Sequence, residues 1–447
     1  MKTLEESLSK IFNIGVLITE NQLEDYAVDG CIPRMVVRPR TVEAMSQILS
    51  LASEYGSKVV PWGGGTQMGL GNPPTEVDLI VDTTRLDRIL DYQPKDLTAT
   101  VEAGITLDTF KQHLALNEQT VLLEAPQPHS ATIGGILAAN SSGPSRSSYG
   151  TAREWLIGVK VVHSDGRVTK SGGKVVKNVT GYDLNKLYVG SLGTLGIIAE
   201  ATFKLAPIQP CKQALVATFA SVGSALNASA RLRNCNYSPN AVQVVSGNAL
   251  IKLPQRYFPQ DAKIAVVISF SGRLKAVERQ IYETSRLMQR SEASEVENIP
   301  DPEATNLLQA IANLGWTGDD VPWLTLKLVL LPSHIEAIVG VLPALTQPLG
   351  DPGIVADVGF GSMQLFWWDT ELLGEDTILS VQRTISNLRK SLISVHGTVV
   401  VERCASEVKS NISVWGDDPD GIEIMRRIKH ELDPSCTFNT GRFIGGI

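Results

Sequence analysis

A glycine- and proline-rich stretch, PWGGGTQMGLGNPP at residues 61–74, restricts the possible folds of this chain more than any other segment. It follows the apolar pair Val59-Val60, so it begins directly after a predicted strand. Glycine loses more backbone freedom on folding than any other residue. A dense run of glycine at this place therefore predicts either a linker or a loop that wraps closely around something.

Successive glycines can present their backbone N–H groups to one anion, and side chains there would block the approach of a diphosphate. Thr66 and Gln67 would add side-chain donors. The stretch is neither a Rossmann fingerprint, because Asn72-Pro73-Pro74 follows it in place of a helix, nor a Walker loop, because no G-K-[ST] follows. The alternative is a flexible surface turn. The candidate binding residues are Pro61, Trp62, Gly63, Gly64, Gly65, Thr66 and Gln67.

The composition limits the class of protein. The 447 residues are too many for one ordinary core, so two or three domains are expected. A hydrophobic content of 43% and a charged content of 19% are typical of a globular chain. The net charge of −7, without a basic block, argues against nucleic-acid binding. Small anionic ligands remain compatible, because they need only local donors.

The cysteines are widely spaced and form no C-x-x-C pair. We therefore expect free thiols in a reducing compartment, with neither an iron–sulfur cluster nor a zinc ribbon in this chain. The six histidines show no H-x-H or H-E-x-x-H spacing, so no metal site is predicted. No signal peptide and no run of about 18 apolar residues is found. We expect a cytoplasmic protein that meets a membrane only through a partner.

Hydrophobic periodicity predicts an α+β fold. Strands are expected at 34–40, 57–61, 77–82, 98–104 and 193–207, helices at 41–56, 107–117 and 132–140, and a strand–turn–strand unit at 155–176. The pattern of the sequence changes after Pro207, where helical segments alternate with apolar runs. The predicted parts are an N-terminal helical segment (1–29), a first domain (30–208), a second α+β domain (209–392) and a C-terminal segment (393–447) that returns to the first domain.

Two more glycine-rich segments follow the first loop. APQPHSATIGGILAANSSGPSRSSYGTARE (125–154) is poor in charge, and a long loop of this kind is costly unless it is buried against something. Close packing of small residues is the alternative to ligand binding. GSLGTLGIIAEATFKLAP (190–207), taken alone, is a strand with a glycine-rich entry.

In this order and spacing, the three segments resemble the FAD-binding domain of the vanillyl-alcohol oxidase and p-cresol methylhydroxylase superfamily. The resemblance covers residues 30–207 and implies a two-subdomain FAD-binding domain with a smaller α+β cap domain. It implies that the first loop holds the FAD pyrophosphate, that T-I-G-G runs beside the flavin, and that G-T-L-G-I-I lies along the adenosine half. The further FAD-binding residues are then Pro126, Thr132, Ile133, Gly134, Gly135, Ala139, Asn140, Gly143, Tyr149, Gly193, Gly196, Ile197, Ile198 and Asn439.

A closer resemblance lies in VKNVTGYDLNKLYVGSLGTLGII (176–198) and DPSCTFNTGRF (433–443). Both resemble flavoprotein subunits of bacterial glycolate oxidase and related D-2-hydroxy-acid dehydrogenases, although Thr440 stands where that group has proline. The group's S-G-E-H-G-I-G segment is replaced by ISVHGTVVVERCASEVK (393–409). With this replacement segment the chain is more similar to the E-type than to the D-type subunit. The replacement leaves open whether the chain turns over substrate itself.

The catalytic candidates are few. His396 is a candidate base or carboxylate ligand at the flavin, with a satisfied interface histidine as the alternative. Lys177 and Tyr182, together with Asn178, are candidates to hold a substrate carboxylate or the flavin ring, and Arg442 to pair with an anion; structural roles are the alternatives. FAD is expected to be bound non-covalently, and His129 is the only histidine or cysteine near the predicted flavin segments.

The resemblance implies an FAD-dependent oxidoreductase subunit that oxidises a 2-hydroxy acid, glycolate above all, by hydride transfer to flavin N5. It further implies a D-type flavoprotein subunit and an iron–sulfur subunit as partners, the latter to carry the electrons onward. The alternatives are a stand-alone D-lactate or D-2-hydroxyglutarate dehydrogenase, an FAD-binding relay or structural subunit that never meets substrate, and a non-redox nucleotide-binding protein.

Overall fold

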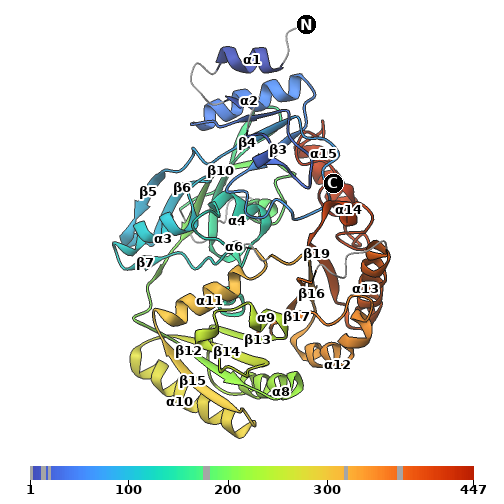
Figure 1. The fold of residues 1–447 in the computed structure, drawn as a ribbon. Coiled ribbons are helices and arrows are strands. Elements are labelled where there is room, and N and C mark those ends of the chain that lie inside the picture. The colour runs from blue at the N-terminus through green and yellow to red at the C-terminus, as the bar shows by residue number, and fades with distance from the viewer. Residues whose placement is uncertain (1–3, 12–16, 19–21, 175–181, 317–320, 370–375) are drawn as a thin grey trace. The chain divides into compact units, whose positions relative to one another are not determined.

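The computed structural model of the chain describes residues 4–11, 17–18, 22–174, 182–316, 321–369 and 376–447. The chain forms two compact units (Figure 1). The first unit comprises Met1–Ser142, Thr151–Ile208 and Asp417–Ile447. The second unit comprises Gly143–Gly150 and Gln209–Gly416.

The first unit begins with a small mixed sheet of strand order β1-β2-β4-β3. Its strands are β1 (Leu17–Ile18), β2 (Met35–Val37), β3 (Val59–Trp62) and β4 (Leu79–Asp82). β4 runs parallel to both of its neighbours, and α2 (Val42–Glu54) connects β2 to β3. Thr41 caps α2 by accepting a hydrogen bond from the Ala44 amide. The buried face of α2 and of α1 (Leu4–Ile11) closes one side of this sheet.

A second sheet in the first unit is antiparallel, with the order β5-β6-β10-β8-β9. Its strands are β5 (Ile89–Gln93), β6 (Thr98–Glu102), β8 (Leu156–Val162), β9 (Val168–Gly172) and β10 (Ile197–Lys204). Helices α3 (Leu107–Ala115), α4 (Ile133–Ala139) and α6 (Ala152–Trp155) contribute to the same apolar core, in which Phe110 meets Phe203. Short strands β7 (Gln119–Thr120) and β11 (Ala206–Pro207) pair beside it, and α7 (Asn185–Tyr188) precedes β10.

The C-terminal segment completes the first unit. After α15 (Ile422–Leu432), the chain runs beside β3: the Val59 amide donates to the Thr437 carbonyl at 2.8 Å, and the Asn439 amide donates to the Val59 carbonyl at 3.0 Å. The segment therefore extends the first sheet by a short parallel bridge, and this brings residues near 440 to the end of β3.

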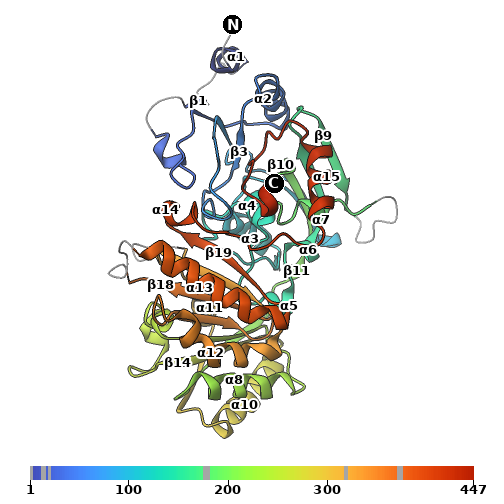
Figure 2. The ribbon, with the colours of Figure 1, turned by 90° about the vertical axis from the view of Figure 1, so that its right-hand side faces the viewer.

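The second unit is built on an eight-stranded antiparallel sheet of order β15-β12-β14-β13-β17-β18-β16-β19. The strands are β12 (Cys211–Thr218), β13 (Ala241–Ser246), β14 (Ile264–Gly272), β15 (Glu295–Pro300), β16 (Leu324–Val329), β17 (Gly353–Asp357), β18 (Ser362–Trp367) and β19 (Thr398–Cys404). Helices α8 (Val222–Arg233), α10 (Leu274–Arg290), α12 (Ile335–Thr346) and α13 (Thr377–Leu392) cover one face (Figure 2). The opposite face packs against α9 (Asn248–Ile251) and α11 (Glu303–Asn313).

The predicted α+β fold is confirmed, but the expected domain limits differ from the two units. We expected the return to the first domain at residue 393, yet β19 pairs with β16 along its length, and the return begins at Asp417. Residues 143–150, which contain α5 (Arg146–Tyr149), were expected in the first domain and belong to the second unit. The helix at the N-terminus is part of the first unit, because Leu4 and Leu8 share a core with α2.

Candidate functional site

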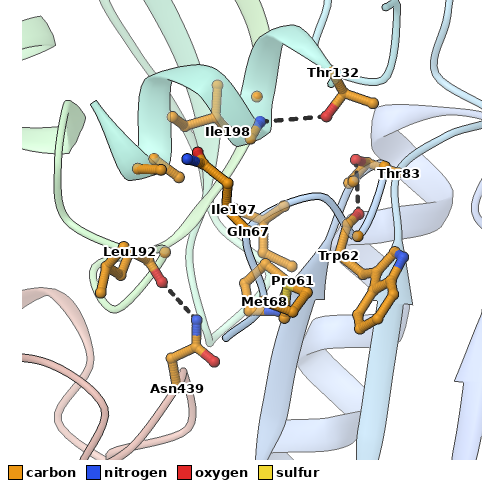
Figure 3. Close-up of a pocket in the computed structure, with 18 of the residues that line it drawn as sticks. Pro61, Trp62, Gln67, Met68, Thr83, Thr132, Leu192, Ile197, Ile198 and Asn439 are labelled. Carbon is orange, nitrogen blue, oxygen red and sulfur yellow. Dashed lines mark hydrogen bonds between the residues drawn. The ribbon is translucent and has the colours of Figure 1, made fainter. Parts of the chain in front are cut away.

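The first unit contains a pocket lined by the first glycine loop, α4, the entry to β10 and the C-terminal segment (Figure 3). It holds about 770 Å³ of empty space, a volume that includes its open mouth. Four segments that are far apart in the sequence thus meet at one place. The predicted binding residues that line it are Pro61, Trp62, Gly63, Gly64, Gly65, Thr66, Gln67, Thr132, Gly134, Gly135, Ala139, Gly193, Gly196, Ile197, Ile198 and Asn439.

The glycines of the first loop are required by close packing, which the sequence did not reveal. A Cβ on Gly64 would lie 1.7 Å from the Ser130 carbonyl oxygen, and a Cβ on Gly63 would lie 2.2 Å from Thr132 Oγ1. Gly65 has φ of +70°, which favours glycine. We expected these glycines to admit a ligand; the structure shows that they let the loop pack against the segment that leads into α4.

The loop offers unpaired donors to the pocket. Within the described chain, the backbone N–H groups of residues 63–68 donate no hydrogen bond to protein acceptors. All six residues line the pocket. Backbone N–H groups without a protein partner require water or a ligand, and several in succession form an anion-binding concavity. This donor set fits a diphosphate.

The wall formed by α4 depends on close packing. Thr132 caps the helix by accepting a hydrogen bond from the Gly135 amide at 3.3 Å. Gly134 lies against Ala103, where a Cβ would come within 2.9 Å of the alanine methyl group. The small residues Gly135, Ala138 and Ala139 face the pocket, whereas Ile133 is buried in the core of the unit. An apolar surface without bulky side chains fits a flat ring system.

The opposite wall joins the entry of β10 to the C-terminal segment. The Asn439 side-chain amide donates to the Leu192 carbonyl, as Figure 3 shows. Both residues have positive φ, 44° for Asn439 and 51° for Leu192. Asn tolerates this backbone conformation better than most residues, so Asn439 holds the Leu192 turn against the end of β3.

Arg442 is a lining residue of the pocket that also contacts the first glycine loop. Its buried guanidinium donates to the carbonyls of Met68 and Leu70, the second at 2.7 Å, and its own carbonyl accepts from the Asn72 amide. Burial lowers the pKa of Arg442 to about 10, so the group stays protonated at neutral pH. We expected Arg442 to pair with an anion near the flavin; in the structure Arg442 lines the pocket and also holds the first glycine loop in place.

None of the other catalytic candidates that the structure describes lines this pocket. Lys177 and Asn178 lie outside the described residues. Tyr182 is 90% exposed and is not a lining residue. His396 is exposed, with φ of 51°, just after the 3-10 turn Ile393–Val395 of the second unit. His129 is exposed and bonds Asp108 at 2.9 Å, so it also lies outside the lining.

Some predicted binding residues fall outside the pocket, and some lining residues were missed. Pro126, Ile133 and Asn140 are in the first unit but do not line the pocket, and Gly143 and Tyr149 belong to the second unit. Lining residues without a sequence prediction are Met68, Leu70, Thr83, Ala138 and Leu192. The first two and the last two lie within the three glycine-rich segments of the sequence analysis; Thr83 comes from another strand end, where its hydroxyl donates to the Trp62 carbonyl.

The described part of the chain contains neither a metal-binding cluster nor a membrane-spanning helix. No group of three or more histidine, cysteine, aspartate or glutamate side chains there could hold a metal ion. None of the helices described is both long and apolar enough to span a membrane.

Comparison with known proteins agrees with this geometry. Residues 33–172 match the family described as the FAD binding domain. This part of the chain is therefore similar to an FAD-binding domain. It contains the first glycine loop and α4, and therefore two walls of the pocket. The predicted cofactor, FAD, is confirmed on this evidence.

Full-length relatives extend the similarity beyond that domain. The chain is 28% identical to glycolate oxidase subunit GlcD of Bacillus subtilis, over 92% of this chain and 89% of that protein. It is 24% identical to a probable mitochondrial D-lactate dehydrogenase of Danio rerio, over 97% and 88% of the two chains. The predicted class, an FAD-dependent oxidoreductase related to glycolate oxidase subunits, is confirmed.

A solved structure supports the predicted fold. The crystal structure of p-cresol methylhydroxylase with substrate bound superposes with a TM-score of 0.75 at 15% identity, covering 98% of this chain and 96% of that one. At this identity the likeness concerns the fold alone. The p-cresol methylhydroxylase type of fold is thereby confirmed.

Proposed function

We propose that this chain is the FAD-carrying subunit of an oxidoreductase that acts on 2-hydroxy acids, with glycolate, oxidised to glyoxylate, as the substrate. The observation that carries the proposal is the row of unpaired N–H groups at residues 63–68 within the FAD-binding domain. The substrate class is supported by relatives named for glycolate and D-lactate. When bound, FAD accepts a hydride from the substrate carbon.

Different residues of the pocket hold different parts of the cofactor. The N–H groups of residues 63–68 bind the diphosphate, while Gly135, Ala138 and Ala139 leave room for the ring system. Asn439 and Arg442 hold the turn at Leu192 and the loop at Met68 in position. Neither histidine nor cysteine lies among the lining residues of the described chain, which supports non-covalent binding.

The partners are part of the proposal. We infer that a D-type flavoprotein subunit and an iron–sulfur subunit complete the enzyme, and that any contact with a membrane is made through them. The named relative is a D-type subunit, so the E-type assignment of this chain rests on the sequence of residues 393–409. A tagged chain expressed with both partners should copurify with them in fixed ratio; a chain that stays alone would favour the stand-alone dehydrogenase.

Anaerobic spectroscopy tests the substrate. The purified chain should carry FAD that is released on denaturation, and glycolate should bleach the visible flavin band. Bleaching by D-lactate alone would replace glycolate as substrate. A flavin that stays oxidised with both acids, alone and with the partner subunits, would overturn the enzymatic proposal and favour a relay subunit.

Two alanine variants of the same loop test the cofactor site. Gly64→Ala places a methyl group on the Ser130 carbonyl, whereas a Cβ on Gly69 has no atom within 4 Å. We expect Gly64→Ala to lose most of its FAD and Gly69→Ala to keep it, as measured by flavin absorbance per protein. Equal FAD content in the two variants would contradict the proposed role of the loop.

A further inference from the structure

A group of polar side chains lies on one face of the sheet of the second unit, where β16, β18 and β19 run side by side. Leu324, Leu326 and Leu328 point into the core under the helices α12 and α13. The alternating residues Thr325 and Lys327 therefore lie on the other face. Lys327 pairs across the strands with Gln364, and Thr325 pairs with Arg403.

An irregularity in β19 adds a carboxylate to this face. The register shifts between Thr325 and Leu326, so Glu402 and Arg403 together occupy the place of one residue. Glu402 is buried and accepts from Lys327 Nζ at 3.0 Å and from Gln364 Nε2 at 2.6 Å. The charges of Lys327 and Glu402 therefore offset each other.

Arg403 is left as the uncompensated charge of this group. Among the described residues it has no hydrogen bond and no ion pair, although it is partly buried. Burial lowers the pKa of Arg403, the direction expected for a cation that is partly removed from water without an anionic partner. A guanidinium in this condition is suited to bind an anion from outside the chain.

Thr325 gives a second, independent indication. Its side chain is 3% exposed, and Oγ1 has no hydrogen-bond partner in the described chain. Directly opposed residues of antiparallel strands have Cβ atoms about 5 Å apart, so this hydroxyl lies beside Arg403. A buried hydroxyl without a partner is uncommon in native structures, and a ligand oxygen placed between the two side chains would satisfy both.

We propose that Arg403 and Thr325 form a binding site for the carboxylate of a small organic acid. The planar guanidinium donates two parallel N–H groups to the two carboxylate oxygens, which a lysine cannot do. Thr325 donates its hydroxyl to one of these oxygens. Lys327, already neutralised by Glu402, adds no net charge, so a single carboxylate balances the site. That the acid is a 2-hydroxy acid rests on the proposed function; the existence of the site does not.

Calorimetric titration of oxalate into the FAD-loaded chain tests the site directly, because oxalate has no hydroxyl-bearing carbon to oxidise. We expect Arg403→Gln to weaken oxalate binding by about ten- to a hundredfold. Arg403→Lys should also weaken it, since the charge is kept but the paired donors are lost. Arg290→Gln, an exposed arginine at the end of α10, serves as the matched control and should bind as the wild type does.

Thr325→Val keeps the shape of the side chain and removes the orphan hydroxyl, so it tests the site even if Arg403 variants fail to fold. We expect it to weaken oxalate binding several-fold while the melting temperature stays the same or rises. Wild-type affinity in both Arg403→Gln and Thr325→Val, or no oxalate binding by the wild type at millimolar concentration, would overturn the proposal. Oxalate binding that depends on Arg403 in a chain that glycolate does not reduce would keep the site and reject the proposed function.

Discussion

Replacing Lys429 with methionine should loosen the C-terminal segment that closes the flavin pocket. Lys429 is on α15 and its ammonium group is buried; it donates to Asp433 Oδ2 at 2.6 Å, to the Thr194 carbonyl at 2.8 Å and to the Phe438 carbonyl at 2.9 Å. Asp433 is fully buried and also accepts from the amides of Thr437 and Phe438. One ion pair thus ties α15, the entry of β10 and the segment beside β3 together.

The magnitude follows from the burial of both partners. Removing one member of a buried ion pair leaves an uncompensated charge and costs about 3–5 kcal/mol. Methionine fills similar space, so lost packing adds little. Since one decade in an equilibrium constant is about 1.4 kcal/mol, local opening of residues 433–443 should become about a hundredfold to several thousandfold more frequent. Asn439 and Arg442 lie in this segment, so FAD retention should fall as well.

Native-state hydrogen exchange measured by mass spectrometry follows this local opening. Peptides covering residues 433–443 should lose protection in Lys429→Met, and so should the peptide containing Val59, whose amide donates to Thr437. Arg426→Met is the matched control on the same helix, because Arg426 forms exposed ion pairs with Glu423 and Asp418. It should leave protection unchanged. Unchanged protection of residues 433–443 in Lys429→Met would refute the reasoning.

Three further variants follow from single contacts. Arg442→Met removes the donors to Met68 and Leu70 and should lower the FAD content of the purified chain; wild-type content would show that the loop keeps its shape unaided. Burial raises the pKa of Asp357 from 3.8 to about 6, so the folded state binds the proton more tightly than the unfolded state. The free energy of unfolding should therefore fall by up to about 3 kcal/mol as the pH rises from 4 to 6, seen as a falling melting temperature of the second unit. Asp357→Asn should lack this fall. Identical pH profiles of the melting temperature in the wild type and in Asp357→Asn would contradict the raised pKa of Asp357. Thr132→Val removes the cap of α4 and should cost about 1 kcal/mol, measured as faster exchange of the Gly135 amide, whereas unchanged exchange would mean that the cap contributes nothing.

Much of the site could be predicted from the sequence because its signals are local. A glycine run after an apolar strand marks the first loop, a glycine run before a strand marks the entry of β10, and T-I-G-G marks the start of α4; their order carries the resemblance that predicted the site. Each of these segments can be recognised from a few neighbouring residues, because its backbone conformation and its close approach to other groups depend on the glycines themselves. The α+β class was equally visible, because hydrophobic periodicity reports each strand and helix separately.

Tertiary structure alone decided how these segments are used. The sequence suggested an anion partner for Arg442, and only the fold shows that its guanidinium donates to carbonyls more than 370 residues earlier in the chain. The unit boundary moved to Asp417 because the pairing of β19 with β16 is a long-range property. The same pairing, through one shift of register, places Arg403 opposite Thr325 on the sheet face. Such contacts depend on which segments meet, and local residue preferences carry no information about a partner hundreds of residues away.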